Sequence, residues 1–445
     1  MKNRIFIFQP ILICATIIMF NACFSQWKGE DAVLVINLGR ITGNRAALPW
    51  PPNGDNGFLD QIVFNVELTG PGGTIHITGK KHGESIRAAV LPGRWSVAVE
   101  AFLDSIVYAK GRDSVNVTGG QNNSVAIQMR QVDLTQGDGS PERPFLVYDV
   151  DTLRQLGSGT DGWDMDKHYR QIIDITLPPD LSPSGNWTPK GVYISGGNTG
   201  NIPFEGTFNG NGKTISGLCF DNASDWQGLF RYIGSGGTVK NLTLVEVNIK
   251  GGQGIGAVAG VSIGTVENCY VNGTVQGIWA GSIVGRNFGT VQNCYSEGSV
   301  ISSGEPVGGI VGINDISTPP PVVRNCYTLV NVSGQNVGGV AGNNFAGSIE
   351  NCVALNLSIT ATESCGRIAE GIGSFINNYA QTGMTLTSGT GSSTPSGTAG
   401  DKDGEDVSAG TNPGEYNNRY FWEKTLGWDF SGIWKWGGNN LPALR

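Results

Sequence analysis

One motif recurs through the second half of the chain and limits what the chain can fold into. Near copies of it are GTVENCYVNGTV (264–275), GTVQNCYSEGSV (289–300), VVRNCYTLVNVSG (322–334) and SIENCVALNLSI (348–359). The column aligned on the cysteine reads Leu242, Cys269, Cys294, Cys326, Cys352 and Asn378, and KTISGLCF places Leu218 before them. The steps from Leu242 onward are 27, 25, 32, 26 and 26 residues. A repeat of this length indicates stacked units that bury a continuous core between neighbours.

Each unit consists of short runs that fit strands and not helices. A second motif keeps the same period, as GAVAG (256–260), GSIVG (281–285), GGIVG (308–312) and GGVAG (338–342). The runs are rich in Val, Ile and Gly, and Gly or Asn stands at the joints, where both residue types tolerate a positive φ. We therefore expect each unit to be one coil of a right-handed parallel β-helix, with about seven coils in all.

The columns of the repeat predict which side chains face the interior. Three positions before the cysteine the residues are apolar, namely Val239, Val266, Val291, Val323, Ile349 and Phe375. One position before it stand Asn241, Asn268, Asn293, Asn325, Asn351 and Asn377. Positions three apart on a uniform strand face opposite sides, so the apolar column and the cysteines both face inward only if the chain bends at Asn. We favour the arrangement in which the cysteines face inward, which directs Tyr270, Tyr295, Tyr327 and Tyr379 outward. In the alternative arrangement the tyrosines are buried.

The flanking segments predict an all-β chain of several parts. Residues 31–132 alternate apolar and polar positions between turn signals, which predicts a β-sandwich, and their spacing resembles prealbumin-like or Ig-like modules. Residues 133–200 form a junction and the entry to the solenoid, and 201–380 hold the repeats. Residues 381–419 are rich in Gly, Ser and Thr, which predicts a flexible loop. Residues 420–445 carry Trp422, Trp428, Trp434 and Trp436 and predict an aromatic cap that returns to the solenoid.

The N-terminus has the features of an export signal. Lys2 and Arg4 precede an apolar run, and Ala22 stands immediately before Cys23. This arrangement resembles a bacterial lipoprotein signal, although Phe20 departs from the small aliphatic residue that is usual there. The resemblance implies a signal peptide over 1–22, a lipid on Cys23, a tether over 23–30 and an outer-membrane lipoprotein that faces the cell exterior. The alternative is an ordinary signal peptide cut near Ser25 and a secreted protein.

The segments GGIVGIND and RNCYTLVNVSG, with their equivalents in the other units, resemble the GLUG repeats of bacterial surface proteins. GNWTPKG (185–191) with FEGTFNGNGKTISGL (204–218) resembles the entry segment of such proteins, and GWDFSGIWKW resembles their ending. The resemblance covers residues 135–445 and implies a surface-exposed β-solenoid. It implies no single activity, because GLUG repeats accompany adhesin-like and protease-associated chains alike.

The repeated cysteines predict core residues and not a reactive site. They lack the CxxC spacing of zinc sites, and His76, His82 and His168 lie outside the repeats. Disulfides are common in exported cysteine-rich chains, but the same column accepts Leu242 and Asn378, so pairing is not required there. We expect buried reduced thiols at Cys269, Cys294, Cys326 and Cys352, with no metal and no cofactor.

Other motifs do not support a nucleotide site, a calcium site or catalysis. FNGNGKT (208–214) lacks the first glycine of a P-loop, since Thr207 stands there, and a strand-like run follows it. Asp161, Asp164 and Asp166 lack the calcium-loop pattern. The acids of the repeats occupy different columns and form no close catalytic pair; they are Glu267, Glu297, Glu305, Asp315 and Glu350. Charged residues are 15% of the chain and the net charge is −8, without a basic cluster, which argues against a nucleic-acid partner.

These inferences predict a non-catalytic cell-surface protein that uses its solenoid for adhesion or scaffolding. The expected ligand is a glycan or a host or matrix protein. Tyr270, Tyr295, Tyr327 and Tyr379 are candidate contacts, because an exposed aromatic column is a stacking platform for sugars. The alternatives are that these rings only cover the sheet, and that the protein is a glycan-active β-helix enzyme such as a polysaccharide lyase or hydrolase.

Overall fold

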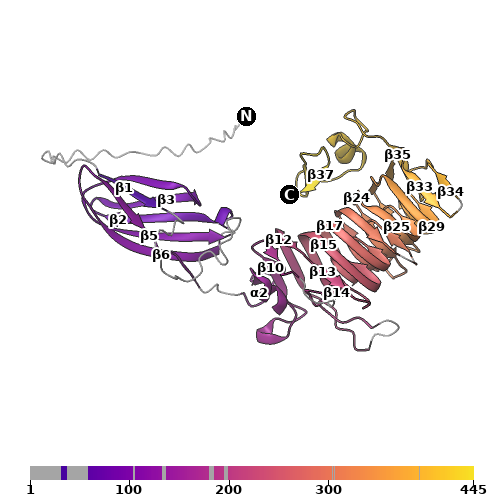
Figure 1. The fold of residues 1–445 in the computed structure, drawn as a ribbon, viewed down its shortest axis with the longest axis horizontal. Coiled ribbons are helices and arrows are strands. Elements are labelled where there is room, and N and C mark those ends of the chain that lie inside the picture. The colour runs from indigo at the N-terminus through magenta and orange to yellow at the C-terminus, as the bar shows by residue number, and fades with distance from the viewer. Residues whose placement is uncertain are drawn as a thin grey trace, which may run out of the picture. The chain divides into compact units, whose positions relative to one another are not determined.

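The computed structural model describes residues 32–37, 59–103, 106–132, 137–179, 185–194, 199–302, 304, 306–389 and 391–445. The predicted signal segment, the tether and Cys23 lie outside these ranges. Two compact units make up the chain, Met1–Val132 and Asp133–Arg445 (Figure 1). No helix within the described ranges has the length and apolar character needed to cross a bilayer.

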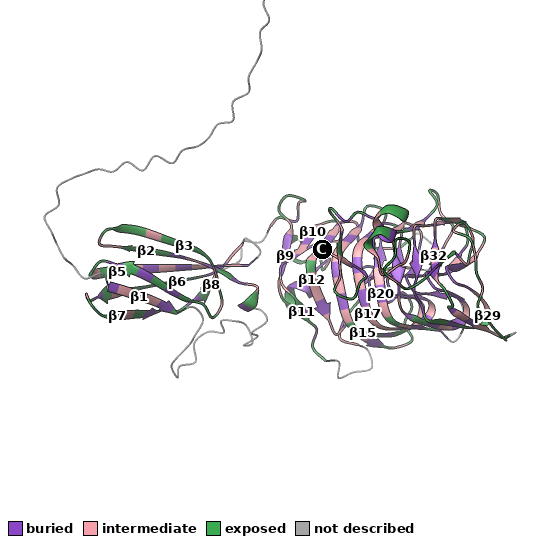
Figure 2. Cartoon of the chain, turned by 90° about the horizontal axis from the view of Figure 1, so that it is seen from above, coloured by how far each residue is buried: buried purple, intermediate pink, exposed green. Residues whose placement is uncertain are grey.

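The N-terminal unit consists of two β-sheets, with strand orders β4-β1-β7 and β3-β2-β5-β6-β8. The strands are β1 Ala32–Asn37, β2 Val63–Gly70, β3 Gly73–Lys81, β4 Ser85–Val90, β5 Gly93–Leu103, β6 Ile106–Val117, β7 Asn122–Ala126 and β8 Arg130–Gln131. Buried and more exposed residues alternate along β5 (Figure 2), because successive side chains of a strand point to opposite faces. The alternation in the sequence therefore predicted the strands correctly. The pair β1–β7 is parallel, whereas β1–β4 and the pairs of the larger sheet are antiparallel.

The C-terminal unit is a parallel β-solenoid whose coils stack in chain order (Figure 1). One residue of each coil pairs with the next in a column that reads Phe145, Tyr169, Phe208, Val239, Val266, Val291, Val323, Ile349 and Phe375. The column has nine positions, one in each coil, whereas the sequence predicted about seven coils. The first three positions hold aromatic residues that lie outside the repeat pattern. The strands of this row are β9 Phe145–Val147, β10 His168–Gln171, β12 Thr207–Ser216, β15 Thr238–Gly256, β17 Thr265–Gly281, β19 Thr290–Gln292, β23 Val322–Arg324, β27 Ser348–Glu350 and β31 Ser374–Ile376.

Further rows of strands complete each coil. A six-stranded parallel sheet contains β14 Phe230–Ile233, β16 Ala259–Ser262, β18 Val284–Asn287, β22 Val311–Asn314, β26 Ala341–Asn344 and β30 Ala369–Gly371. The entry segment contributes β11 Ile175–Thr176, and the remaining solenoid strands up to Gln381 are β13 Cys219–Asp221, β20 Tyr295–Ile301, β21 Val307–Gly308, β24 Tyr327–Thr328, β25 Asn331–Gly338, β28 Val353–Ala354, β29 Ser358–Gly366 and β32 Tyr379–Gln381. The entry segment adds helix α2 (Val150–Gln155), which the Asp149 side chain caps by accepting from the Thr152 N–H, and the short 3₁₀ helix η2 (Thr160–Gly162).

The side chains of the cysteine column face the interior, which is the arrangement favoured from the sequence. Cys269, Cys294, Cys326 and Cys352 are fully buried, and their thiols are free. Each thiol donates a weak hydrogen bond to the backbone carbonyl two residues earlier; for Cys294 the distance from Sγ to the Gln292 oxygen is 3.1 Å. Cysteine suits this position because it is small and apolar and its S–H can serve the carbonyl at the bend.

The asparagine before each cysteine makes the corner. Asn241, Asn268, Asn293, Asn325, Asn351 and Asn377 all have φ between 52° and 54°, in the left-handed region that Asn tolerates better than most residues. The equivalent corner in the preceding coil is Gly210–Gly212, because Lys213 pairs with Leu242. The expectation that Leu218 belongs to the cysteine column is therefore wrong. This corner, in which Gly210 and Gly212 flank Asn211, is longer than the single Asn corner of the later coils. Aligning this coil with the others by sequence motif therefore gave the wrong residue for the cysteine column.

The segment predicted as a flexible loop, 381–419, contains strands. They are β33 Thr385–Ser388, β34 Gly391–Ser393 and β35 Glu405–Val407. β35 pairs in parallel with β32 and so extends the solenoid by part of a coil. The chain then forms the π-helix η3 (Phe421–Thr425) and a small antiparallel sheet of β36 (Trp434–Trp436) and β37 (Pro442–Leu444).

Candidate functional site

An aromatic stack runs along the outer face of the solenoid. The strand register places Tyr270 beside Tyr295 and Tyr295 beside Tyr327. The ring centroids of the first pair lie 4.2 Å apart and those of the second 4.9 Å, with interplanar angles of 15° and 5°. Val353 follows in the column and interrupts the stack before Tyr379. The spacing between coils matches the distance at which rings stack, so the repeat itself builds the platform.

The C-terminal segment covers most of this stack. Trp422, Trp428 and Trp434 surround Tyr327, which is only 1% exposed and whose hydroxyl donates to the Pro442 carbonyl. Tyr379 packs edge-on against Phe421. The expectation of four outward tyrosines free for a ligand therefore needs correction. The rings do point away from the solenoid core, but at Tyr327 they form a second core with the aromatic cap.

Tyr270 is the end of the stack that the cap leaves partly open. Its hydroxyl donates a hydrogen bond of 3.1 Å to Glu297 Oε2, and Asn272 donates to the same oxygen. Burial, together with the negative charge of Glu297, raises the pKa of Tyr270 to about 12. The phenol therefore stays protonated at neutral pH, and the ring is held at one edge by Glu297 and on one face by Tyr295.

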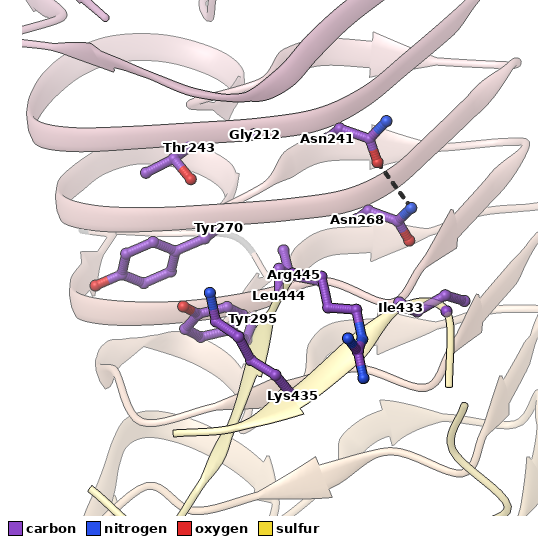
Figure 3. A pocket seen from close by; sticks show the side chains of 11 residues that line it. Gly212, Asn241, Thr243, Asn268, Tyr270, Tyr295, Ile433, Lys435, Leu444 and Arg445 are labelled. Atoms are coloured by element: carbon purple, nitrogen blue, oxygen red, sulfur yellow. Dashed lines mark hydrogen bonds between the residues drawn. The ribbon is translucent and has the colours of Figure 1, made fainter. Parts of the chain in front are cut away.

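A groove lies between Tyr270 and the sheet of β36 and β37 (Figure 3). It encloses about 240 Å³. Its lining residues come from three corners of the solenoid and from the end of the chain, namely Gly212, Asn241, Thr243, Asn268, Tyr270, Tyr295, Gly432, Ile433, Lys435, Leu444 and Arg445. Residues more than 200 positions apart in the sequence thus form one site, which explains why no local motif indicated it.

The corner asparagines supply amide groups to one wall of the groove. Asn241 Nδ2 donates to Asn209 Oδ1 at 3.0 Å, and Asn268 Nδ2 donates to Asn241 Oδ1 at 2.9 Å (Figure 3). The ladder is interrupted after Asn268, since Asn293 does not donate to it, and it resumes where Asn325 donates to Asn293. Asn268 Oδ1 is buried and has no hydrogen-bond donor within the described ranges. This acceptor is therefore unsatisfied, but it is shielded from the groove as well as from water.

Two cations lie on the opposite wall. Lys435 is exposed and forms no ion pair with any residue in the described part of the chain. Arg445 is held by its Nε and Nη2 atoms, which donate to the carbonyls of Trp434 and Phe430 at 3.1 and 2.7 Å. None of the lining residues has a carboxylate side chain. The groove thus combines an aromatic face, amides and positive charge.

The acids considered as catalytic candidates have separate structural partners. Glu267 accepts from Gln292 at 2.7 Å, and Asp315 pairs with Arg286 at 2.6 Å. Glu350 accepts from its neighbour Ser348, and Glu305 lies outside the described residues. No group of three or more His, Cys, Asp or Glu that could hold a metal ion occurs among the described residues. The P-loop-like segment 208–214 lies within β12, so no helix follows it.

The sequence did not indicate a second, fully buried amide ladder. Asn287 Nδ2 donates to Asn314 Oδ1, and Asn314 Nδ2 donates to Asn344 Oδ1, both at 2.9 Å. The signal was present in GRNF, GIND and GNNF, where Asn follows the glycine motif in each unit. Buried amides need such partners, so this ladder is structural and carries no ligand role.

Comparisons with known proteins agree with this architecture. The GLUG motif family matches residues 333–360, which span β25 and the first strands after it. Halomucin of Haloquadratum walsbyi is 32% identical over 142 residues, which is 32% of this chain and 2% of halomucin. A protein of Evansella cellulosilytica, provisionally named a Gly-rich membrane protein, is 34% identical over 145 residues, which is 15% of its length. The chain therefore spans only a small part of these two relatives.

A crystal structure from Bacteroides ovatus has a similar fold. It carries the provisional description immunoglobulin A1 protease, and it superposes on 69% of this chain and 94% of that chain with a TM-score of 0.51. The sequence identity is 19%, so the likeness concerns the fold alone. The chain therefore contains the GLUG motif, carried on a parallel β-solenoid.

Proposed function

We propose that this protein is a non-catalytic component of the cell envelope that uses its solenoid for adhesion or scaffolding. The observation that carries the proposal is the groove beside Tyr270. It offers an aromatic face, amides and cations, and its lining contains no His, Cys, Asp or Glu side chain to act as nucleophile or general acid. Such a set of groups is suited to holding a ligand.

The relatives support a place at the cell surface. Their printed names are halomucin and a Gly-rich membrane protein, and the matched regions lie in chains far longer than this one. The solenoid adds a rigid scaffold, since hydrogen bonds between parallel strands join each of its nine coils to the next. A rigid surface loses little conformational entropy on contact, which favours adhesion.

The test is a binding array of glycans and matrix proteins, probed with the full chain, beside a turnover assay on a polysaccharide panel. We expect binding to at least one ligand and no release of sugar ends. Turnover that disappears on a single carboxylate substitution would instead establish the glycan-active enzyme.

The membrane attachment at Cys23 is tested separately. We expect palmitate labelling of the exported protein to disappear in Cys23→Ala and to persist in the control Cys14→Ala, which lies within the apolar run of the signal segment. Equal labelling of both variants would contradict a lipid on Cys23.

A further inference from the structure

We infer that the groove beside Tyr270 binds one acidic sugar residue of a glycan, with the sugar ring on Tyr270 and its carboxylate toward Lys435. The inference rests on the proposed adhesive function and names the ligand class and the contact site. Three observations support it: the open ring face, the size of the groove and the unpaired cation.

The aromatic stack ends where a further ring would fit. The outer column reads Thr243, Tyr270, Tyr295 and Tyr327 in successive coils. One face of Tyr270 is taken by Tyr295, and the other is turned toward the small side chain of Thr243 (Figure 3). Because coils repeat at the stacking distance, a ring at the level of Thr243 would continue the stack. The apolar C–H face of a sugar is suited to the negative face of an aromatic ring.

The groove has the size and the polar groups for a single sugar residue. Its volume is about 240 Å³. The Thr243 hydroxyl and the amide of Asn241 line it and offer polar groups to the sugar hydroxyls.

The charge of the groove selects an acidic sugar. Lys435 carries a positive charge and has no ion-pair partner among the described residues, whereas the charge of Arg445 also acts on the Asp429 carboxylate. The chain as a whole has a net charge of −8, so the groove is a local exception. The Glu297 carboxylate lies close to the ring, but it is already engaged by hydrogen bonds from Tyr270 and Asn272. Repulsion by acids farther away than about 8 Å is screened at physiological ionic strength, whereas a direct contact with Lys435 is not.

The experiment titrates the full chain with oligogalacturonate and with its methyl ester, which keeps the rings and removes the charge. We expect the wild-type protein to bind oligogalacturonate about tenfold more tightly than the ester, the factor that one charge-assisted contact supplies. Lys435→Ala should abolish this preference, whereas Lys250→Ala, which alters an exposed cation at a different column, should keep it. Sialyllactose and lactose repeat the comparison with a second acidic sugar.

Thr243→Tyr tests the location. It places a phenol where the sugar ring would lie, and the column already carries tyrosine at the next three coils, so we expect a folded protein that no longer binds. Tyr270→Ala provides a second variant that removes the platform if the first variant loses thermal stability. Both should lower affinity for the acid and for the ester.

The outcomes separate this inference from the proposed function. Equal binding of acid and ester by the wild-type protein overturns the acidic preference. Acid binding that survives both Thr243→Tyr and Tyr270→Ala overturns the site and leaves adhesion standing. If the wild-type protein binds an acidic peptide or a matrix protein but no sugar, the saccharide inference is wrong while adhesion stands. If nothing binds, both are wrong.

Discussion

The Tyr327 hydroxyl donates a hydrogen bond of 2.6 Å to the backbone carbonyl of Pro442. This contact joins the middle of the solenoid to the last strand of the chain. Trp434 and Trp428 stack with their ring centroids 4.6 Å apart and cover the same tyrosine. The aromatic cap therefore has its own core, separate from the interior of the coils.

The cap should open independently of the coils. Trp434→Ala removes a fully buried indole and should cost about 3–5 kcal/mol. Because the coil core is a separate cluster, we expect the loss of hydrogen-exchange protection to be confined to the cap and the strand of Tyr327. Trp436→Ala, at a half-buried position of the same strand, is the matched control and should have a smaller effect. Simultaneous loss of protection throughout the solenoid would contradict two separate cores.

The asparagine corner combines a backbone requirement with a side-chain requirement, and two substitutions at Asn325 separate them. Asn325 has φ of 53° and donates to Asn293 Oδ1 at 3.2 Å. Asn325→Gly keeps the backbone conformation and loses the ladder bond, at about 0.5–1.5 kcal/mol. Asn325→Ala loses the same bond and also keeps a Cβ in the left-handed region without the polar side chain that lets Asn adopt it, which adds about 1 kcal/mol. Denaturant midpoints should therefore rank wild type above Gly and Gly above Ala; the reverse order of Gly and Ala would contradict the backbone requirement.

The repeat cysteines should be unreactive in the folded protein. Burial raises the pKa of Cys269, Cys294 and Cys326 well above the ordinary value, so the reactive thiolate is scarce as well as inaccessible. We expect alkylation followed by mass spectrometry to modify Cys219 and Cys365, which are partly exposed, before the four column cysteines. Denaturant should make all of them react. Column cysteines that remain unmodified after denaturation, and react only after reduction, would indicate disulfides.

The stability of the protein should fall at alkaline pH through Tyr270. The folded pKa of about 12 lies above the ordinary value of 10.0. Between these values the unfolded phenol has lost its proton while the folded phenol keeps it, so the folded state binds more protons and stability decreases as pH rises. The contribution is complete below pH 10 and lost as pH passes 12.

Tyr270→Phe should flatten this alkaline decline, and Glu297→Gln should move the titration of Tyr270 toward lower pH, because the Glu297 charge raises the pKa. Phenolate absorbance, measured as the difference between wild type and Tyr270→Phe, reports the titration directly. An unchanged titration in Glu297→Gln would mean that burial alone sets the pKa.

Much of the solenoid followed from the sequence because each coil repeats the same local demands. The interval between cysteines indicated stacked strands, and the three-residue offset between Val291 and Cys294 required a bend at Asn293. The structure has that bend, with φ of 53° at Asn293 and the side chains of Val291 and Cys294 buried. The coil count was too low because Phe145, Tyr169 and Phe208 fill the same column without the motif.

The sequence by itself determined the coil, since strand period, corner residue and core residue are local properties that recur in every unit. Only the tertiary structure decided what the tyrosine column does. Tyr270 and Tyr327 stand in equivalent repeat positions, yet Tyr327 is buried beneath the cap and Tyr270 borders an open groove. The difference arises because the chain end returns to one part of the solenoid, and that docking depends on contacts such as Tyr327 with Pro442 that no local period encodes.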